Sequence, residues 1–141
     1  MTKPTFEKVL LIVAPKAGQG DLHLNLIKIV PPLAASFPAF YILRTKEQCA
    51  APKYCQQFAS KVDLIIVFGG DGTVFVCTNG LAPLEIRPTL SIIPGGTCND
   101  FSRTLGCPQN IAKAAKLITK EHVIPVDVAK ANGQHFLNFW G

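Results

Sequence analysis

The chain has 141 residues, of which 48% are hydrophobic and 16% charged, a composition that excludes a disordered chain and fits one globular domain. Its net charge of +5 favours anionic partners such as nucleotides, lipid headgroups or nucleic acid, although a solvated basic surface is an equal alternative. The lysines and arginines are scattered rather than clustered, so we predict no nucleic-acid partner.

The cysteines and the apolar segments bear on the cellular compartment. The five cysteines are odd in number and include no C-x-x-C pair, so we expect reduced thiols rather than disulfides or a zinc site. The N-terminus lacks a signal-peptide pattern, and the longest uncharged stretch, residues 29–43, is too short to cross a membrane. We therefore expect a soluble cytoplasmic protein that can contact a membrane peripherally.

The first elements alternate between strand and helix patterns. Residues 9–14 form a continuous apolar run typical of a strand buried on both faces, and residues 15–20 follow as a loop. Asp21 can cap a helix, which Pro31 and Pro32 should limit or kink. The apolar positions of this helix are Leu22, Leu26, Ile29, Val30 and Leu33.

The alternation continues through the middle of the chain. Residues 40–43 predict a second strand, and the segment of residues 45–61 contains a predicted helix with Pro52 near its first turn. Residues 64–68 (LIIVF) give the clearest buried strand, and a glycine-rich loop, residues 69–72, follows at once.

A second strand, loop and helix unit comes next. A short helix is expected over residues 73–79, with Gly80 as its stop. Residues 89–93 predict another strand, a second glycine-rich loop covers residues 94–97, and residues 99–105 are expected to be helical.

The last third contains one more helix and a hairpin. Asn110 can cap a helix with an apolar stripe at Ile111, Ala114, Ala115 and Ile118. Residues 123–129 and 136–139 read as two strands joined by a turn at Asn132-Gly133. The chain ends within apolar sequence, which favours self-association, so a homo-oligomer is a further expectation.

Alternating strands and helices predict an α/β fold, a Rossmann-like and mainly parallel sheet with helices on both faces. Ligands of such sheets bind beyond the carboxyl ends of the strands. Three loops directly follow predicted strands: PKAGQG, GGDG and PGGT. We expect these loops to gather along one edge of the sheet.

The GGDG loop has a composition suited to phosphate. Three glycines in four positions allow close backbone approach, and exposed N–H groups before a helix favour an anion. Thr73 adds a hydroxyl donor. Asp71 would repel a phosphate unless it holds magnesium or orients a hydroxyl group. A tight turn with an Asx cap is the alternative.

The loop after the next predicted strand repeats this pattern. Gly95 and Gly96 allow close approach, Thr97 can donate to a phosphate, and Asp100 brings a second carboxylate to the same edge. Paired carboxylates beside glycine loops fit metal-assisted phosphoryl transfer. Two capping residues are the alternative.

GGDGTV followed by PGGTCNDFSRTLG resembles the diacylglycerol kinase catalytic domain of bacterial lipid kinases and, more distantly, sphingosine and ceramide kinases. The first motif is shared with NAD kinases and phosphofructokinases, whereas the second is more specific and argues against a NAD kinase. The resemblance extends to residues 14–18, Thr45 and residues 126–139, and so spans nearly the whole chain.

The resemblance implies transfer of the γ-phosphoryl group of ATP to a lipid hydroxyl with the help of magnesium. It implies catalytic roles for Asp71 and Asp100, and a metal-side acidic network of Asp71, Asp100 and Asp127. Asp127 is otherwise an ordinary polar residue at the end of a strand. The implied nucleotide contacts are Pro15, Lys16, Ala17, Gly18, Thr45, Gly69, Gly70, Asp71, Gly72, Thr73, Gly96, Thr97 and Asn99.

The chain departs from the family at three motif positions. Ala14 replaces a usual Asn, and Phe75 and Val76 replace an Asn-Glu pair expected to face the nucleotide. The family also carries a β-rich second domain that completes the active site, and it is absent from residues 1–141. We therefore expect the nucleotide-binding half of the enzyme, which binds nucleotide weakly and does not turn over alone. The alternative is a degenerate, non-catalytic nucleotide-binding or interaction module.

Overall fold

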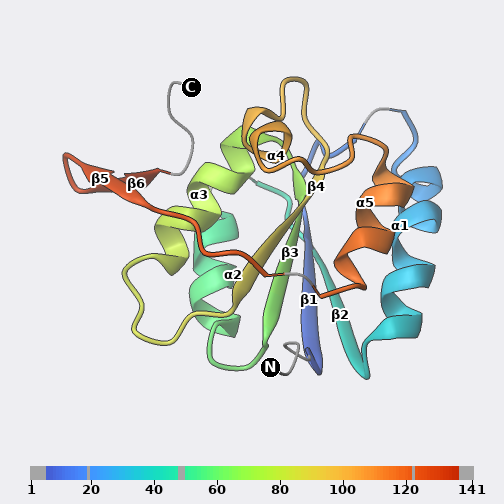
Figure 1. Cartoon of the computed structure of the whole chain (residues 1–141), viewed down its shortest axis with the longest axis horizontal. Coiled ribbons are helices and arrows are strands. Elements are labelled where there is room, and N and C mark those ends of the chain that lie inside the picture. The colour runs from blue at the N-terminus through green and yellow to red at the C-terminus, as the bar shows by residue number, and fades with distance from the viewer. Residues whose placement is uncertain (1–5, 19, 48–49, 122, 137–141) are drawn as a thin grey trace.

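The computed structural model describes residues 6–18, 20–47, 50–121 and 123–136. Four parallel strands form one sheet in the order β2-β1-β3-β4 (Figure 1). These strands are β1 (Lys8–Val13), β2 (Ala39–Arg44), β3 (Leu64–Gly69) and β4 (Thr89–Pro94). Helices α1 (Leu22–Ser36) and α5 (Ile111–Ile118) cover one face, and α2 (Ala51–Phe58) and α3 (Asp71–Leu81) cover the other. The predicted fold class is confirmed.

The two central strands are buried on both faces, as their continuous apolar runs predict. Side chains of a strand alternate between faces, so Val9 and Leu11 pack toward α1 and α5, whereas Leu10 and Ile12 pack toward α2 and α3. The six residues of β3 are all buried. The sheet thus has an apolar layer on each side, and its carboxyl-end loops are held on a rigid support.

Helix α1 begins where the sequence predicts but is not stopped by its prolines. The Asp21 carboxylate accepts a hydrogen bond from the His23 N–H at 2.8 Å, which caps the first turn. The helix continues through Pro31 and Pro32 to Ser36. Burial of apolar residues on both sides of the prolines outweighs the backbone hydrogen bonds that they cannot donate, since Ile29 and Leu33 are fully buried.

The sequence locates the start of α2 but not the end of α3. Helix α2 covers Ala51–Phe58 within the segment of residues 45–61, and Pro52 lies in its first turn as predicted. Helix α3 starts at Asp71 and continues through Gly80, so the expectation that Gly80 stops the helix is wrong. A Cβ atom placed on Gly80 would lie 2.8 Å from the Cα of Pro52, so this glycine allows α2 and α3 to cross closely.

We therefore predict that Gly80→Ala destabilises the protein, although alanine favours a helix over glycine by about 1 kcal/mol. Overpacking against Pro52 should outweigh that gain and lower the free energy of unfolding by roughly 1–2 kcal/mol. Urea denaturation followed by circular dichroism measures the change. Gly80→Val should lower stability further, and a higher midpoint for Gly80→Ala would contradict this packing explanation.

The C-terminal hairpin is shorter than predicted. Strands β5 (Ala129–Ala131) and β6 (Gln134–Phe136) pair antiparallel around Asn132-Gly133, both in the left-handed region with φ of 52° and 79°. The predicted strand over residues 123–129 is wrong for residues 123–128, which pair with no described strand. The predicted strand residues 137–139 lie outside the described part of the chain.

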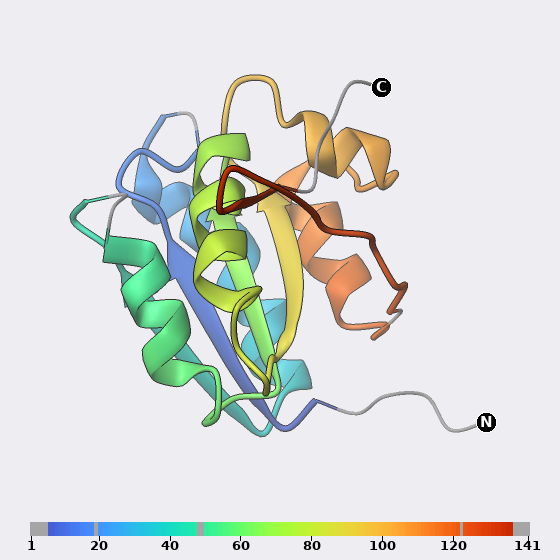
Figure 2. The same cartoon turned by 90° about the vertical axis from the view of Figure 1, so that its left-hand side faces the viewer.

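Asn79 attaches this hairpin to helix α3. Its side-chain amide donates to the His135 carbonyl at 2.7 Å and accepts from the His135 N–H at 2.8 Å. The amide thereby pairs with the backbone of β6 as a neighbouring strand would. The hairpin lies beside α3 in both views of the molecule (Figure 2).

Apolar surface is concentrated along the outer edge of β4. A hollow of about 510 Å³ runs between β4, α4 (Asp100–Thr104), α5 and residues 123–128. Its lining is largely apolar and includes Ile92, Phe101 and Leu117. Within the described residues, no helix combines the length and apolar character needed to cross a membrane.

Candidate functional site

The loops that follow the four parallel strands meet at one edge of the sheet, as predicted, at the top of Figure 1. Backbone hydrogen bonds connect them. The Gly18 N–H donates to the Gly95 carbonyl at 2.8 Å, and the Gly95 N–H donates to the Gly69 carbonyl at 2.8 Å. The three glycine-rich loops therefore form one continuous surface rather than three independent turns.

The GGDG and PGGT loops touch each other through their glycines. A Cβ atom on Gly96 would lie 2.5 Å from the Cα of Gly70, and a Cβ atom on Gly70 would lie 2.9 Å from the Cα of Gly96. A Cβ atom on Gly69 would meet Thr73 Oγ1 at 2.9 Å. A side chain at Gly70 or Gly96 would force the two loops apart, and a side chain at Gly69 would collide with Thr73. Close approach therefore explains these three glycines.

Asp71 joins the two loops through its carboxylate. Oδ2 accepts from the Asp100 N–H at 2.8 Å, and Oδ1 accepts from the Phe101 N–H at 3.1 Å. These amides belong to the first turn of α4, whose own N-cap residue, Asn99, supplies no side-chain cap. Asp71 thus caps α4 from the start of α3, a favourable position for a negative charge.

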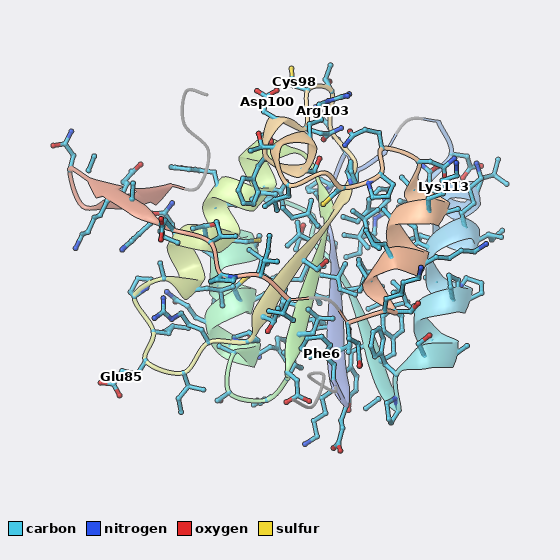
Figure 3. All side chains as sticks on the ribbon, in the orientation of Figure 1. Phe6, Glu85, Cys98, Asp100, Arg103 and Lys113 are labelled. Atoms are coloured by element: carbon cyan, nitrogen blue, oxygen red, sulfur yellow. The ribbon has the colours of Figure 1, made fainter. Side chains whose placement is uncertain are left out.

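Asn99 holds the PGGT loop internally. It adopts the left-handed conformation with φ 53° and is only 8% exposed. Its side-chain Oδ1 accepts from the Gly96 N–H and its Nδ2 donates to the Gly96 carbonyl, both at 2.9 Å. Thr97, Cys98 and Asp100 remain exposed, and Figure 3 shows Cys98 and Asp100 at the upper edge of the molecule.

A hollow of about 420 Å³ lies between the first loop and the two glycine loops. We call it the glycine-loop hollow. Eight of the predicted nucleotide contacts line it: Pro15, Lys16, Ala17, Gly69, Gly70, Gly72, Thr73 and Gly96. Five predicted contacts do not: Gly18, Thr45, Asp71, Thr97 and Asn99.

Four lining residues were absent from the predicted contacts: Ala14, Lys46, Glu47 and Gly95. Lys46 and Glu47 come just after Thr45 in the loop that follows β2, and this position in the loop is the sequence signal that could have found them. Thr45 itself is buried, with its N–H and Oγ1 both donating to the Val13 carbonyl at 3.0 and 3.2 Å. Thr45 therefore fixes the end of β2, and the residues after it reach the hollow.

The predicted acidic network is only partly assembled. Asp71 and Asp100 adjoin through the hydrogen bond from the Asp100 N–H. Asp127 is exposed in the extended segment before β5, and no group of three acidic, His or Cys side chains suited to a metal occurs among the described residues. Phe75 and Val76 do not line the glycine-loop hollow: Phe75 is exposed and Val76 packs toward α2.

The thiols differ in environment, and none of the four described forms a disulfide. A hydrogen bond with Cys55 and burial hold the pKa of the Cys77 thiol far above its ordinary value. Burial also raises the pKa of the half-buried Cys107. Cys98, in the PGGT loop segment, is exposed, so it is the described thiol most open to reagents.

Because Asp71 caps α4, we predict that Asp71→Ala speeds hydrogen exchange at the amides of Asp100 and Phe101. Loss of two charge-assisted acceptors at a partly exposed site should cost about 1 kcal/mol of stability. Hydrogen exchange followed by NMR resolves both amides. Asp100→Ala is the matched control because it leaves the Asp71 carboxylate in place, and equal exchange in the two variants would contradict the capping role.

Comparison with known proteins identifies the family of this chain. The sequence profile of the diacylglycerol kinase catalytic domain matches residues 8–131. The diacylglycerol kinase of Bacillus subtilis (strain 168) is 52% identical over 80 residues, which are 56% of this chain and 26% of that protein. A relative from Staphylococcus haemolyticus (strain JCSC1435) is 33% identical over 141 residues, covering 96% of this chain and 46% of that protein.

The solved structures include a crystal structure of a diacylglycerol kinase from Bacillus anthracis str. Sterne. It is 86% identical, superposes with a TM-score of 0.93, and aligns with 96% of this chain and 50% of its own. This chain belongs to the diacylglycerol kinase catalytic domain family. It spans about half the length, or less, of these relatives.

Proposed function

We propose that this chain is the nucleotide-binding half of a lipid kinase that transfers the γ-phosphoryl group of ATP to the hydroxyl of diacylglycerol or a similar lipid. The observation that carries the proposal is the glycine-loop hollow at the start of α3. Five of the twelve residues in its lining are glycines of the GGDG and PGGT loops, so a ligand can approach the backbone N–H groups there without obstruction from side chains at these positions.

The start of α3 supports phosphate binding in particular. The helix begins at Asp71, so the N–H groups of its first turn lack helical acceptors. Gly72 and Thr73 lie in that turn and line the hollow. Such N–H groups and the helix dipole favour an anion, and two lysines line the same hollow.

Asp71 and Asp100 are too few to form a metal cage from protein ligands alone, but their number suits a magnesium ion. Magnesium in kinases is held by one or two carboxylates together with substrate phosphates and water. The Asp71 carboxylate accepts the N–H groups of Asp100 and Phe101, and each of its oxygens keeps a second acceptor position. The residue next to it in this contact, Asp100, is exposed. Bound there, the ion would neutralise charge on the transferred phosphoryl group. That Asp127 also contributes to this magnesium site stays a prediction.

The lipid side of the reaction rests on the family. A lipid acceptor must be taken from a membrane surface, and the net charge of +5 supports peripheral contact with anionic headgroups. The relatives are about twice as long or more. We therefore propose that residues 1–141 bind nucleotide but do not phosphorylate lipid without the remainder of such a chain.

One observation favours the alternative of a non-catalytic nucleotide-binding module. Ala14 lines the glycine-loop hollow at the position where the family usually has Asn. An amide that could hold a nucleotide is therefore missing from the wall of the site itself. Ala14→Asn should strengthen nucleotide binding if this position limits affinity.

We predict that the chain binds ATP weakly and more tightly with magnesium than without it, as isothermal titration calorimetry would show. Asp71→Ala should abolish the magnesium dependence, because the variant loses both the proposed ligand and the cap of α4. Ser36→Ala, on the exposed end of α1 and outside the hollow, is a matched control. Phosphorylation of diacylglycerol by the chain alone would contradict the proposed need for a longer chain.

Bound nucleotide should also protect Cys98 from alkylation. The thiol is exposed and lies two residues after Gly96, which lines the hollow, so a ligand that holds the PGGT loop in place should slow its reaction with iodoacetamide severalfold. Cys107 provides an internal control: its raised pKa lowers the thiolate fraction, so it should react slowly at pH 7 and faster as pH rises. Peptide mass spectrometry resolves the two sites, and an unchanged Cys98 rate at saturating ATP would count against the site.

A further inference from the structure

Lys46 is an exposed lysine two residues after the end of β2; its neighbour Thr45 belongs to the family resemblance, but Lys46 itself does not. We propose that Lys46 is a phosphate-binding residue of the glycine-loop hollow and sets its preference for a polyphosphate. The proposal rests on the proposed function, because it assumes that the hollow takes a nucleotide. It adds a cationic contact from the segment after β2, where the family resemblance names only Thr45.

The position of Lys46 is fixed by the residue before it. Thr45 is 2% exposed, and its N–H and hydroxyl both donate to the Val13 carbonyl at the end of β1. These two bonds hold the end of β2 against β1. The next residue, Lys46, therefore leaves the sheet at a defined point and lines the hollow beside the first loop.

The charges around the hollow favour an anion with several phosphates. The ionisable residues in its lining are two lysines and one glutamate: Lys16, Lys46 and Glu47. The two nearest motif carboxylates are not in the lining, and Asp71 has both of its oxygens bonded to α4 amides. The lining thus carries an excess of one positive charge before the N–H groups of α3 are considered.

The order of the strands separates the two kinds of phosphate contact. Lys46 follows β2 and Lys16 follows β1, whereas the glycine backbones follow β3 and β4. A ligand lying across this edge meets ammonium groups on one side and backbone N–H groups on the other. An extended polyphosphate can use both sides at once, whereas a single phosphate has one group to place on either side. A lysine here therefore selects for the number of phosphates.

The test is isothermal titration of the chain with ATP at low and moderate salt, using Lys46→Gln, Lys46→Arg and a control, Lys116→Gln. A parallel titration with AMP tests the preference for a polyphosphate, because Lys46→Gln should leave AMP binding within twofold of the parent. Lys116 is exposed in the last turn of α5 and does not line the hollow. We expect Lys46→Gln to weaken ATP binding about five- to tenfold at low salt. Lys46→Arg should restore most of the affinity, and the salt dependence should be shallower for Lys46→Gln than for the parent.

The outcomes separate this inference from the proposed function. If the parent chain binds ATP and Lys46→Gln binds it within twofold of the parent, the role of Lys46 is wrong while the nucleotide site stands. An equal loss in Lys116→Gln would also overturn it, because the effect would then reflect net charge alone. If the parent chain binds no ATP at millimolar concentration, both the inference and the nucleotide site fail. Melting temperatures of all variants should agree within a few degrees.

Discussion

The contact between the backbones of Gly70 and Gly96 sets the geometry of this edge of the molecule. A methyl group at either position would lie within 3 Å of the opposite Cα. The GGDG and PGGT loops can adjoin only because both positions lack side chains, and the Asp71 carboxylate then spans the short distance to the amides of α4. The start of α3, the PGGT loop and α4 therefore behave as one unit, and the shape of the hollow follows from it.

The sequence predicted the sheet well because its signals are local. The apolar runs of β1 and β3, the caps at Asp21 and Asn110 and the Asn132-Gly133 turn are each readable within a few residues. Gly80 was misread because its meaning comes from Pro52 on another helix. Residues 123–128 were misread because an apolar run does not form a strand without a partner.

The candidate site shows the same division between local and long-range information. Glycine loops after strands predict where a phosphate can approach, and most of the hollow follows from that rule. The same rule does not predict the roles of Thr45 and Asn99, because the hydrogen bonds that these two side chains make depend on how each loop folds. Lys46 has no motif, and only the position of β2 beside β1 brings it to the hollow.

The attachment of the hairpin by Asn79 implies an asymmetric tolerance to sequence change. The amide of Asn79 contacts the main chain of His135 and not its imidazole. Every residue except proline offers the same N–H and carbonyl, so position 135 can vary widely during evolution without loss of this bond. Position 79 has no such freedom, since only asparagine has a donor and an acceptor at this reach. Substitutions should therefore accumulate at position 135 in the hairpin and not at position 79 in α3.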